Sequence, residues 1–383
     1  MISPKLLALV RCPACHATLT GAPSALTCVS CGRRYGGPSP DFLDLRPKEN
    51  FEEQTKYLDE ALHADARHER VSPPLLGSKI RNDMLRAFLA PQPGDLVVDL
   101  GCGSGRGLLW NRDWRGYAVG IDIAPFFARE SRDQVDLLLG DLRRLPFADG
   151  TFTKAYSLDV LEHLSPDALR GMLTEAARVL APGGQLFVYT HVRKNAPIAV
   201  GLRWINALAR RLERAGLIDM RQERLRKSDH LNPLADIPDL KRVAEETGFR
   251  IARIRYYTPL VGGFVENILI RLAEKRLANR AKGAKSALGA NGAGASGAGA
   301  NGAGAKGAEG AAGAPISDEA ALKMARSEGK RRVAESASTR TLLRALSAAM
   351  KLDLVLFGRI ESGPFFALLE RTPSRQPPPS GPL

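Results

Sequence analysis

A glycine-rich loop directly after a short apolar run constrains this chain more than any other stretch. Residues 96–100, LVVDL, read as a buried strand, because parallel strands covered on both faces form short apolar runs bounded by turn residues. Gly101, Gly103 and Gly105 follow at once, and glycine lets a backbone turn sharply and come close to a ligand. A helical segment comes next, so the stretch predicts an α/β unit that binds a ligand at its loop.

The spacing of the glycines separates two kinds of nucleotide loop. The dinucleotide fingerprint G-x-G-x-x-G does not fit, because Arg106 or Leu108 stands where its third glycine belongs. The stretch reads D-x-G-x-G-x-G from Asp99 to Gly105 instead. This pattern resembles motif I of the class I methyltransferases that use S-adenosylmethionine (SAM). A tight strand-to-helix turn without a ligand is the alternative for the loop taken alone.

Four further motifs follow this loop in order. D-L-G-C-G-S-G is followed by G-I-D, G-D-L, L-D-V-L-E-H-L and L-A-P-G-G, over roughly residues 95–190. The ordered set resembles the methyltransferase type 11 group. The resemblance implies an α/β, Rossmann-like sheet of seven strands, of which the last is antiparallel. Residues 364–370 supply a suitable last strand.

The same resemblance assigns the residues that hold SAM. Asp99 and the three glycines are expected at its methionine end, and Asp141 with Leu142 at its adenine. Asp122 ends the next strand about 20 residues after the glycines, where a nucleotide site places an acid on the ribose hydroxyls. The full expected set is Asp99, Gly101, Cys102, Gly103, Gly105, Asp122, Ile123, Asp141, Leu142, Ser157 and Leu158.

Two histidines are candidates for a catalytic base. His163 follows the fourth expected strand and His191 follows the fifth, at the carboxyl ends where open α/β sheets bind ligands. A base is required only if the acceptor is a hydroxyl, an acidic carbon or a protonated amine. A purely structural role is the alternative for each histidine.

Four of the five cysteines form two pairs near the start of the chain. Cys12 and Cys15 make one C-x2-C pair, and Cys28 and Cys31 make the second. Two such pairs suit tetrahedral zinc, and four thiolates leave no open position, so we expect a structural Zn2+. A redox dithiol is the weaker alternative. With the residues around them, the pairs resemble a Trm112-like zinc ribbon.

Composition divides the chain further. We expect the zinc ribbon at 1–46, the methyltransferase domain at 47–280 and its C-terminal part, with the last strand, at 336–372. Between these two parts, 281–335 is rich in alanine and glycine and reads as a disordered insertion, and 373–383 reads as a disordered tail. Tyr57 and Arg81, before the first strand, are candidate contacts of a lid over the cofactor.

The net charge of +14 is concentrated in two segments. Residues 193–227 hold ten basic and three acidic residues, and residues 276–344 hold twelve and five. Such segments suit RNA, an anionic membrane surface or an acidic substrate, or are simply solvated. No stretch is long and apolar enough to span a membrane, and no signal peptide is evident, so we expect a cytoplasmic protein.

These features predict a SAM-dependent methyltransferase that modifies an oxygen, carbon or nitrogen atom of a small-molecule acceptor. Enzymes that methylate base amines typically carry an Asn/Asp-Pro-Pro-aromatic run where this chain reads Ser157-Leu158-Asp159-Val160. One alternative is an rRNA or tRNA methyltransferase that uses the ribbon and the basic segments. Another is a protein with the SAM fold that binds a ligand or partner without transferring methyl groups. The oligomeric state stays open.

Overall fold

The computed structural model describes residues 2–47, 71–194, 200–221, 224, 230–280 and 336–373. Tyr57, the insertion expected at 281–335 and nearly all of the expected tail lie outside the described residues.

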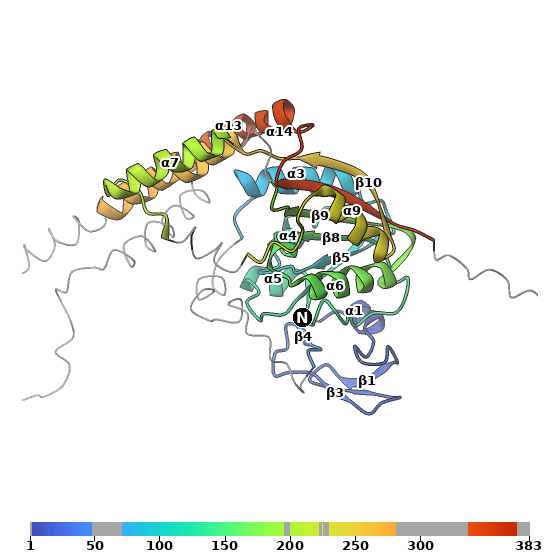
Figure 1. The fold of residues 1–383 in the computed structure, drawn as a ribbon. Coiled ribbons are helices and arrows are strands. Elements are labelled where there is room, and N and C mark those ends of the chain that lie inside the picture. The colour runs from blue at the N-terminus through green and yellow to red at the C-terminus, as the bar shows by residue number, and fades with distance from the viewer. Residues whose placement is uncertain are drawn as a thin grey trace, which may run out of the picture.

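An eight-stranded mixed sheet forms the centre of the molecule, in the order β10-β11-β9-β8-β5-β6-β7-β4 (Figure 1). Its strands are β4 (Leu43–Asp44), β5 (Leu96–Leu100), β6 (Tyr117–Asp122), β7 (Asp136–Leu139), β8 (Phe152–Leu158), β9 (Leu180–His191), β10 (Phe249–Tyr256) and β11 (Pro364–Arg371). β11 runs antiparallel to both of its neighbours, and all other neighbours are parallel. The predicted class I sheet with an antiparallel last strand is confirmed, and β4 adds an eighth strand at one edge.

Helices cover both faces of this sheet. The helices that matter here are α1 (Pro4–Leu9), α3 (Gly77–Leu89), α4 (Arg106–Trp110), α5 (Arg129–Gln134), η3 (Leu161–His163), α6 (Pro166–Val179), α7 (Val200–Arg214), α9 (Ile237–Glu246), α10 (Leu260–Phe264), η5 (Val265–Ile270), α13 (Ala337–Met350) and α14 (Leu352–Phe357). Successive strand residues alternate between two cores, as the pleat requires. Val97 and Phe187 pack in the core with α3, whereas Val98 and Leu186 pack in the core with α6 and α9.

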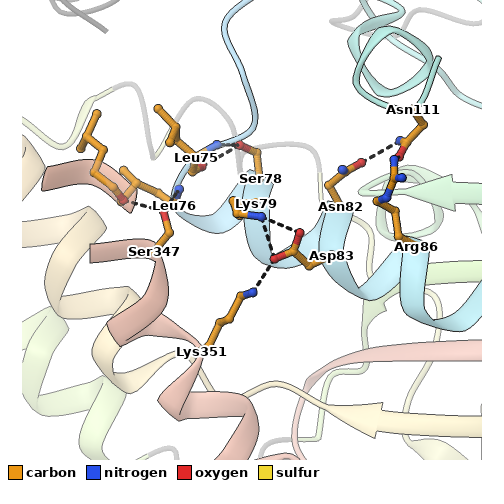
Figure 2. Close-up of polar contacts among 11 residues, drawn as sticks. Leu75, Leu76, Ser78, Lys79, Asn82, Asp83, Arg86, Asn111, Ser347 and Lys351 are labelled. Atoms are coloured by element: carbon orange, nitrogen blue, oxygen red, sulfur yellow. Dashed lines mark hydrogen bonds and ion pairs between the residues drawn. The ribbon is translucent and has the colours of Figure 1, made fainter. Parts of the chain in front are cut away.

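Polar contacts tie α13 to α3, although the two helices are more than 200 residues apart in sequence (Figure 2). Asp83 of α3 forms ion pairs with Lys79 at 2.7 Å and with Lys351 at 2.6 Å. The backbone N–H of Leu76 donates to Ser347 Oγ at 2.7 Å. The hydroxyl of Ser347 in turn donates to the Leu343 carbonyl at 2.6 Å. The C-terminal segment is therefore anchored on the helix that precedes the glycine loop.

α7 lies beside the helical stretch that begins at α10 and runs to residue 280 (Figure 1). Ala209, Ile218 and Ile268 form a small buried core between them. Trp204 is 73% exposed on the outer side of α7. α7 lies within the basic segment 193–227, and it packs on part of its surface only.

The cysteine-bearing segment packs directly onto the large sheet. Its own strands are β1 (Leu19–Ala22), β2 (Ala25–Cys28) and β3 (Arg34–Tyr35), in a three-stranded antiparallel sheet. The backbone N–H of Arg11 donates to the Pro146 carbonyl at 2.8 Å. Leu6, Leu26 and Leu43 belong to the same buried core as Val98. Residues 43–44 then continue into the large sheet as β4, so ribbon and sheet share one core.

Candidate active site

The glycine loop is held between the ends of β5 and β6. Gly101, Gly103 and Gly105 all have positive φ angles, of 83°, 54° and 77°, which side chains disfavour. The carboxylate of Asp122 fixes the loop, because it accepts hydrogen bonds from Gly103 N at 2.7 Å and Ala124 N at 2.9 Å. The nucleotide-type loop predicted from the sequence therefore has the backbone conformation that only glycine adopts freely.

The surroundings of these glycines differ. A Cβ atom at Gly101 would lie 2.5 Å from Val160 Cγ2, and one at Gly105 would lie 2.9 Å from Ser131 Cβ. A Cβ atom at Gly103 would meet nothing within 4 Å. Gly103 therefore faces open space in which a ligand could approach the backbone, and this loop fits the cofactor that the resemblance implies.

Asp99 lies beneath the loop. Its side chain is 4% exposed, and its Oδ2 lies 3.2 Å from the position of a Cβ on Gly107. Burial raises the pKa of Asp99 to about 8, the Tyr156 hydroxyl opposes this rise, and the charge of Asp122 adds to it. Burial also raises the pKa of the Cys102 thiol. The expected role of Asp99 at the methionine end stays a prediction.

Several residues of the expected cofactor-binding set already have partners within the chain. Asp141 accepts hydrogen bonds from the backbone N–H of Arg143 at 2.8 Å and from its guanidinium, through Nε at 3.0 Å and Nη2 at 2.7 Å. The Ile123 carbonyl accepts from Arg46 Nη1 at 3.3 Å. The Ser157 hydroxyl is buried and donates to the Leu100 carbonyl at 2.8 Å, so it joins β8 to β5. Contacts of these groups with a cofactor stay predictions, as do those of Leu142 and Leu158.

A buried glutamate stands at the carboxyl ends of β8 and β9. Glu162 in η3 is 1% exposed, and its Oε2 accepts from Thr190 Oγ1 at 2.9 Å. Its Oε1 lies 3.5 Å from His191 Nδ1. This nitrogen atom is buried and makes no hydrogen bond with the described residues. Burial by itself would raise the pKa of Glu162, but the His191 imidazole lowers it below its ordinary value, with help from Thr190. The carboxylate is therefore charged at neutral pH.

The structure brings both candidate bases to this glutamate and adds a third histidine. The rings of His163 and His230 are 4.6 Å apart and nearly perpendicular. The rings of His191 and His230 are 5.9 Å apart. His230 was not predicted, because it lies far along the chain from the two strand ends. The one hint in the sequence was the scarcity of histidine, of which the whole chain has six.

A second polar group lies on the side of the site that faces α3. Arg81 Nε forms an ion pair with Asp159 Oδ2 at 3.2 Å, and its guanidinium lies over the Tyr189 ring at 5.5 Å. Asp159 has a φ of 56°, a strained backbone conformation that is enriched at functional sites. Arg81 was expected as a lid contact. In the structure, α3 brings it to the residues that follow β8.

The four cysteines of the ribbon converge as a metal site requires. Their sulfur atoms all lie within 4.8 Å of one another. Cys12 and Cys31 are 3.7 Å apart and Cys15 and Cys28 are 3.4 Å apart, close to the roughly 3.8 Å between thiolates on tetrahedral zinc. The backbone N–H of Cys31 donates to Cys28 Sγ at 3.4 Å, a contact that favours the thiolate form that binds metal. These residues fit a zinc ribbon.

Comparison with known proteins agrees with this geometry. Residues 98–188 match the type 11 family model, described as a methyltransferase domain. The chain is 38% identical over 108 residues to "Probable tRNA methyltransferase 9B" of Mus musculus, which covers 27% of this chain and 24% of that protein. It is 33% identical over 116 residues to a sterol 24-C-methyltransferase of Saccharomyces cerevisiae, which covers 26% and 28%. The chain thus spans about a quarter to a third of the length of such relatives.

Solved structures with related folds are more distant. Phosphoethanolamine N-methyltransferase 2 of Haemonchus contortus, in complex with SAM, is 14% identical with a TM-score of 0.42, over 84% of this chain and 58% of that chain. The [4+2]-cyclase SpnF is also 14% identical with a TM-score of 0.42, over 82% of this chain and 91% of that chain.

Within the described part of the chain, no helix combines the length and apolar character needed to cross a bilayer.

Proposed function

We propose that the class I SAM-dependent methyltransferase domain of this chain, which includes residues 98–188, methylates a small-molecule acceptor at an oxygen, nitrogen or carbon atom. One observation carries the proposal. The open space at Gly103 and the polar group around Glu162 belong to one region, because Val160 packs against Gly101 and stands two residues before Glu162. A donor and an acceptor bound at these two places would be neighbours.

The residues of this chain would then have separate tasks. SAM, when bound, supplies a methyl group that its sulfonium already activates. Gly103 allows close approach to the backbone, and Asp122 retains lone pairs that can accept from ribose hydroxyls. We assign Asp141 and Leu142 to the adenine. The main contribution of the protein is to align the two reactants and to exclude water.

His163 and His191 are the candidates for removing a proton from the acceptor. Both lie at the carboxyl ends of strands beside the charged Glu162, which would favour an imidazolium once it forms. Arg81, which lies over the Tyr189 ring, and its ion-pair partner Asp159 would orient a polar acceptor. A proton-bearing acceptor group, hydroxyl or amine, therefore suits this site best.

RNA is the second candidate acceptor. It is favoured by the relatives named for tRNA and by the ten basic residues within 193–227. The exposed charges of α7 lie on a helix that extends away from the sheet (Figure 1). Such charges would bind phosphates without sequence preference and with strong salt dependence.

Calorimetric titration of SAM and S-adenosylhomocysteine into the full chain tests the proposal. We expect binding that Asp122→Asn weakens roughly tenfold or more, which is about 1.4 kcal/mol. Asp133→Asn, an exposed aspartate on α5, is the matched control and should bind as the wild type does. Transfer of labelled methyl to hydroxyl and amine compounds, compared with bulk tRNA, then identifies the acceptor class. A folded chain that binds neither ligand would contradict the proposal.

A further inference from the structure

We propose that Glu162, His163 and His230 form a binding site for one divalent transition-metal ion, separate from the ribbon. Only the role of the ion in the reaction rests on the proposed function, because metal binding itself does not require SAM. Each of the three residues offers one ligand atom, and these atoms lie within 4.8 Å of one another. Ligands about 2.1 Å from a shared ion lie at most about 4.2 Å apart, so a small adjustment of the side chains suffices.

The environment of the carboxylate favours a cation. Glu162 is 1% exposed, and burial of a carboxylate is costly unless the group is paired. Thr190 Oγ1 donates a hydrogen bond to Oε2 of Glu162 and so orients the carboxylate. Carboxylates that bind metal ions are usually oriented by such a neighbour. The backbone N–H of Asn232 donates to the Glu162 carbonyl at 2.9 Å, which holds the segment of His230 against η3.

The donor set indicates which ion would bind. Two imidazoles and a carboxylate suit Zn2+, Fe2+ and Mn2+, and do not suit ions that prefer oxygen alone. Three protein ligands also leave coordination positions open, as in catalytic rather than structural metal sites. His191 Nδ1, at 3.5 Å from Glu162 Oε1, stands at the edge of the group as a further donor or as a partner of the carboxylate.

The position of the site gives the ion a use. It lies at the carboxyl ends of β8 and β9, two residues beyond the Val160 that packs on the glycine loop. A metal ion there would coordinate an oxygen of the acceptor and lower the pKa of a hydroxyl bound to it. His163 would then be a ligand of the ion, which leaves His191 as the residue that removes the proton. Within the proposed function, this narrows the acceptor to molecules that present a hydroxyl to the metal.

Zinc stoichiometry of the full chain tests the inference. Wild-type protein and variants are dialysed against micromolar Zn2+, and bound zinc is measured by elemental analysis. Zinc is the appropriate probe, because it binds such nitrogen and oxygen ligands more tightly than Mn2+ or Fe2+ does. We expect two zinc ions per chain in the wild type, and one in His163→Ala and in His230→Ala.

The matched control is His16→Asn, which removes a histidine outside the group. His16 has a φ of 57°, and asparagine tolerates this conformation. The control should keep both ions. The zinc that remains in the two alanine variants would report an intact ribbon, and circular dichroism would report their fold. One zinc in the wild type, or two in both alanine variants, would overturn the inference.

Calorimetry with SAM on the same samples separates this inference from the proposed function. SAM binding with a single zinc per chain would remove the second metal site and leave the methyltransferase proposal intact. A second zinc without any binding of SAM or S-adenosylhomocysteine would support the site and count against the proposed reaction.

Discussion

The three glycines of the loop share a left-handed backbone but have different reasons to be glycine. At Gly101 a side chain would collide with Val160, whereas at Gly103 only the backbone angle opposes one. Close packing therefore requires glycine at Gly101, whereas access for a ligand is the reason at Gly103. The sequence predicted a close backbone approach at all three positions, and the structure assigns the open space to Gly103.

This difference predicts distinct effects of two alanine substitutions. Gly103→Ala should cost about 1–2 kcal/mol of stability through its φ angle and should reduce SAM affinity roughly tenfold or more, since its Cβ enters the open space. Gly101→Ala should destabilise the fold further, because its Cβ must displace Val160. Thermal unfolding and calorimetry measure the two effects. Wild-type SAM affinity in Gly103→Ala would show that the ligand does not lie against this glycine.

Asp99 makes the stability of the fold depend on pH. Its pKa of about 8 in the folded chain lies above the roughly 3.9 of an unfolded aspartate, so the folded state binds the extra proton. Stability from this group is complete below about pH 4 and is lost as the pH rises through about 8. The loss approaches about 1.4 kcal/mol per pH unit within this window.

The isosteric variant Asp99→Asn removes this titration. Its melting temperature relative to the wild type should therefore rise from pH 5 to pH 8 and level off above about pH 9. Titrating groups that do not interact with Asp99 affect both proteins alike and cancel in the comparison. Melting curves that stay parallel across this range would contradict the protonated, buried state of Asp99.

At the scale of elements, the joint between α3 and α13 connects distant parts of the chain. Ser347 is 1% exposed and accepts the backbone N–H of Leu76, which begins α3 with a left-handed φ of 55°. The hydroxyl thus supplies a partner that the helix start would otherwise lack. α3 in turn carries Arg81 to Asp159, so the position of α13 affects the acceptor side of the site.

Ser347→Ala should destabilise the protein by about 1–3 kcal/mol, because it leaves the part-buried N–H of Leu76 without its partner. Thr341→Ala on the same helix is the matched control, since within the described part of the chain its exposed hydroxyl donates only to the Ala337 carbonyl of its own helix. Urea denaturation gives both values. Equal, small effects of the two substitutions would show that α13 does not stabilise α3.

At the scale of the whole molecule, the core that ribbon and sheet share predicts that the two unfold as one unit. Leu6 and Leu43 pack in the core of the large sheet, and β4 pairs with β7. A metal ion bound at the cysteines would therefore stabilise more than the ribbon itself. The sequence predicted the ribbon as a module of its own at residues 1–46, and a boundary between two folding units there stays a prediction.

Loss of the ribbon zinc tests this coupling. Cys31→Ser removes one exposed thiolate of the expected zinc site. The protein should still unfold in a single transition, with a melting temperature lower by several degrees, at about 2–4 °C for each kcal/mol of unfolding free energy lost. Cys102→Ala, which changes the cysteine outside the ribbon, should keep the zinc. A separate early transition, with the main one unchanged, would show that the ribbon unfolds alone.

The sequence by itself determined the features that depend on neighbouring residues. Apolar runs predicted the strands, glycines predicted the loop, and paired cysteines predicted the ribbon, because pleat, φ angle and ligand spacing are local properties. The order of these motifs was sufficient to predict the class I sheet, including its antiparallel last strand.

Only the tertiary structure decided which distant residues share a site. The meeting of Glu162 with His191 and His230 depends on where β9 and the segment after α7 return to the sheet. Ser347 lies 271 residues from Leu76, and β4 reaches β7 across nearly a hundred residues. Such contacts are set by the packing of a common core, and no local pattern of residues encodes them.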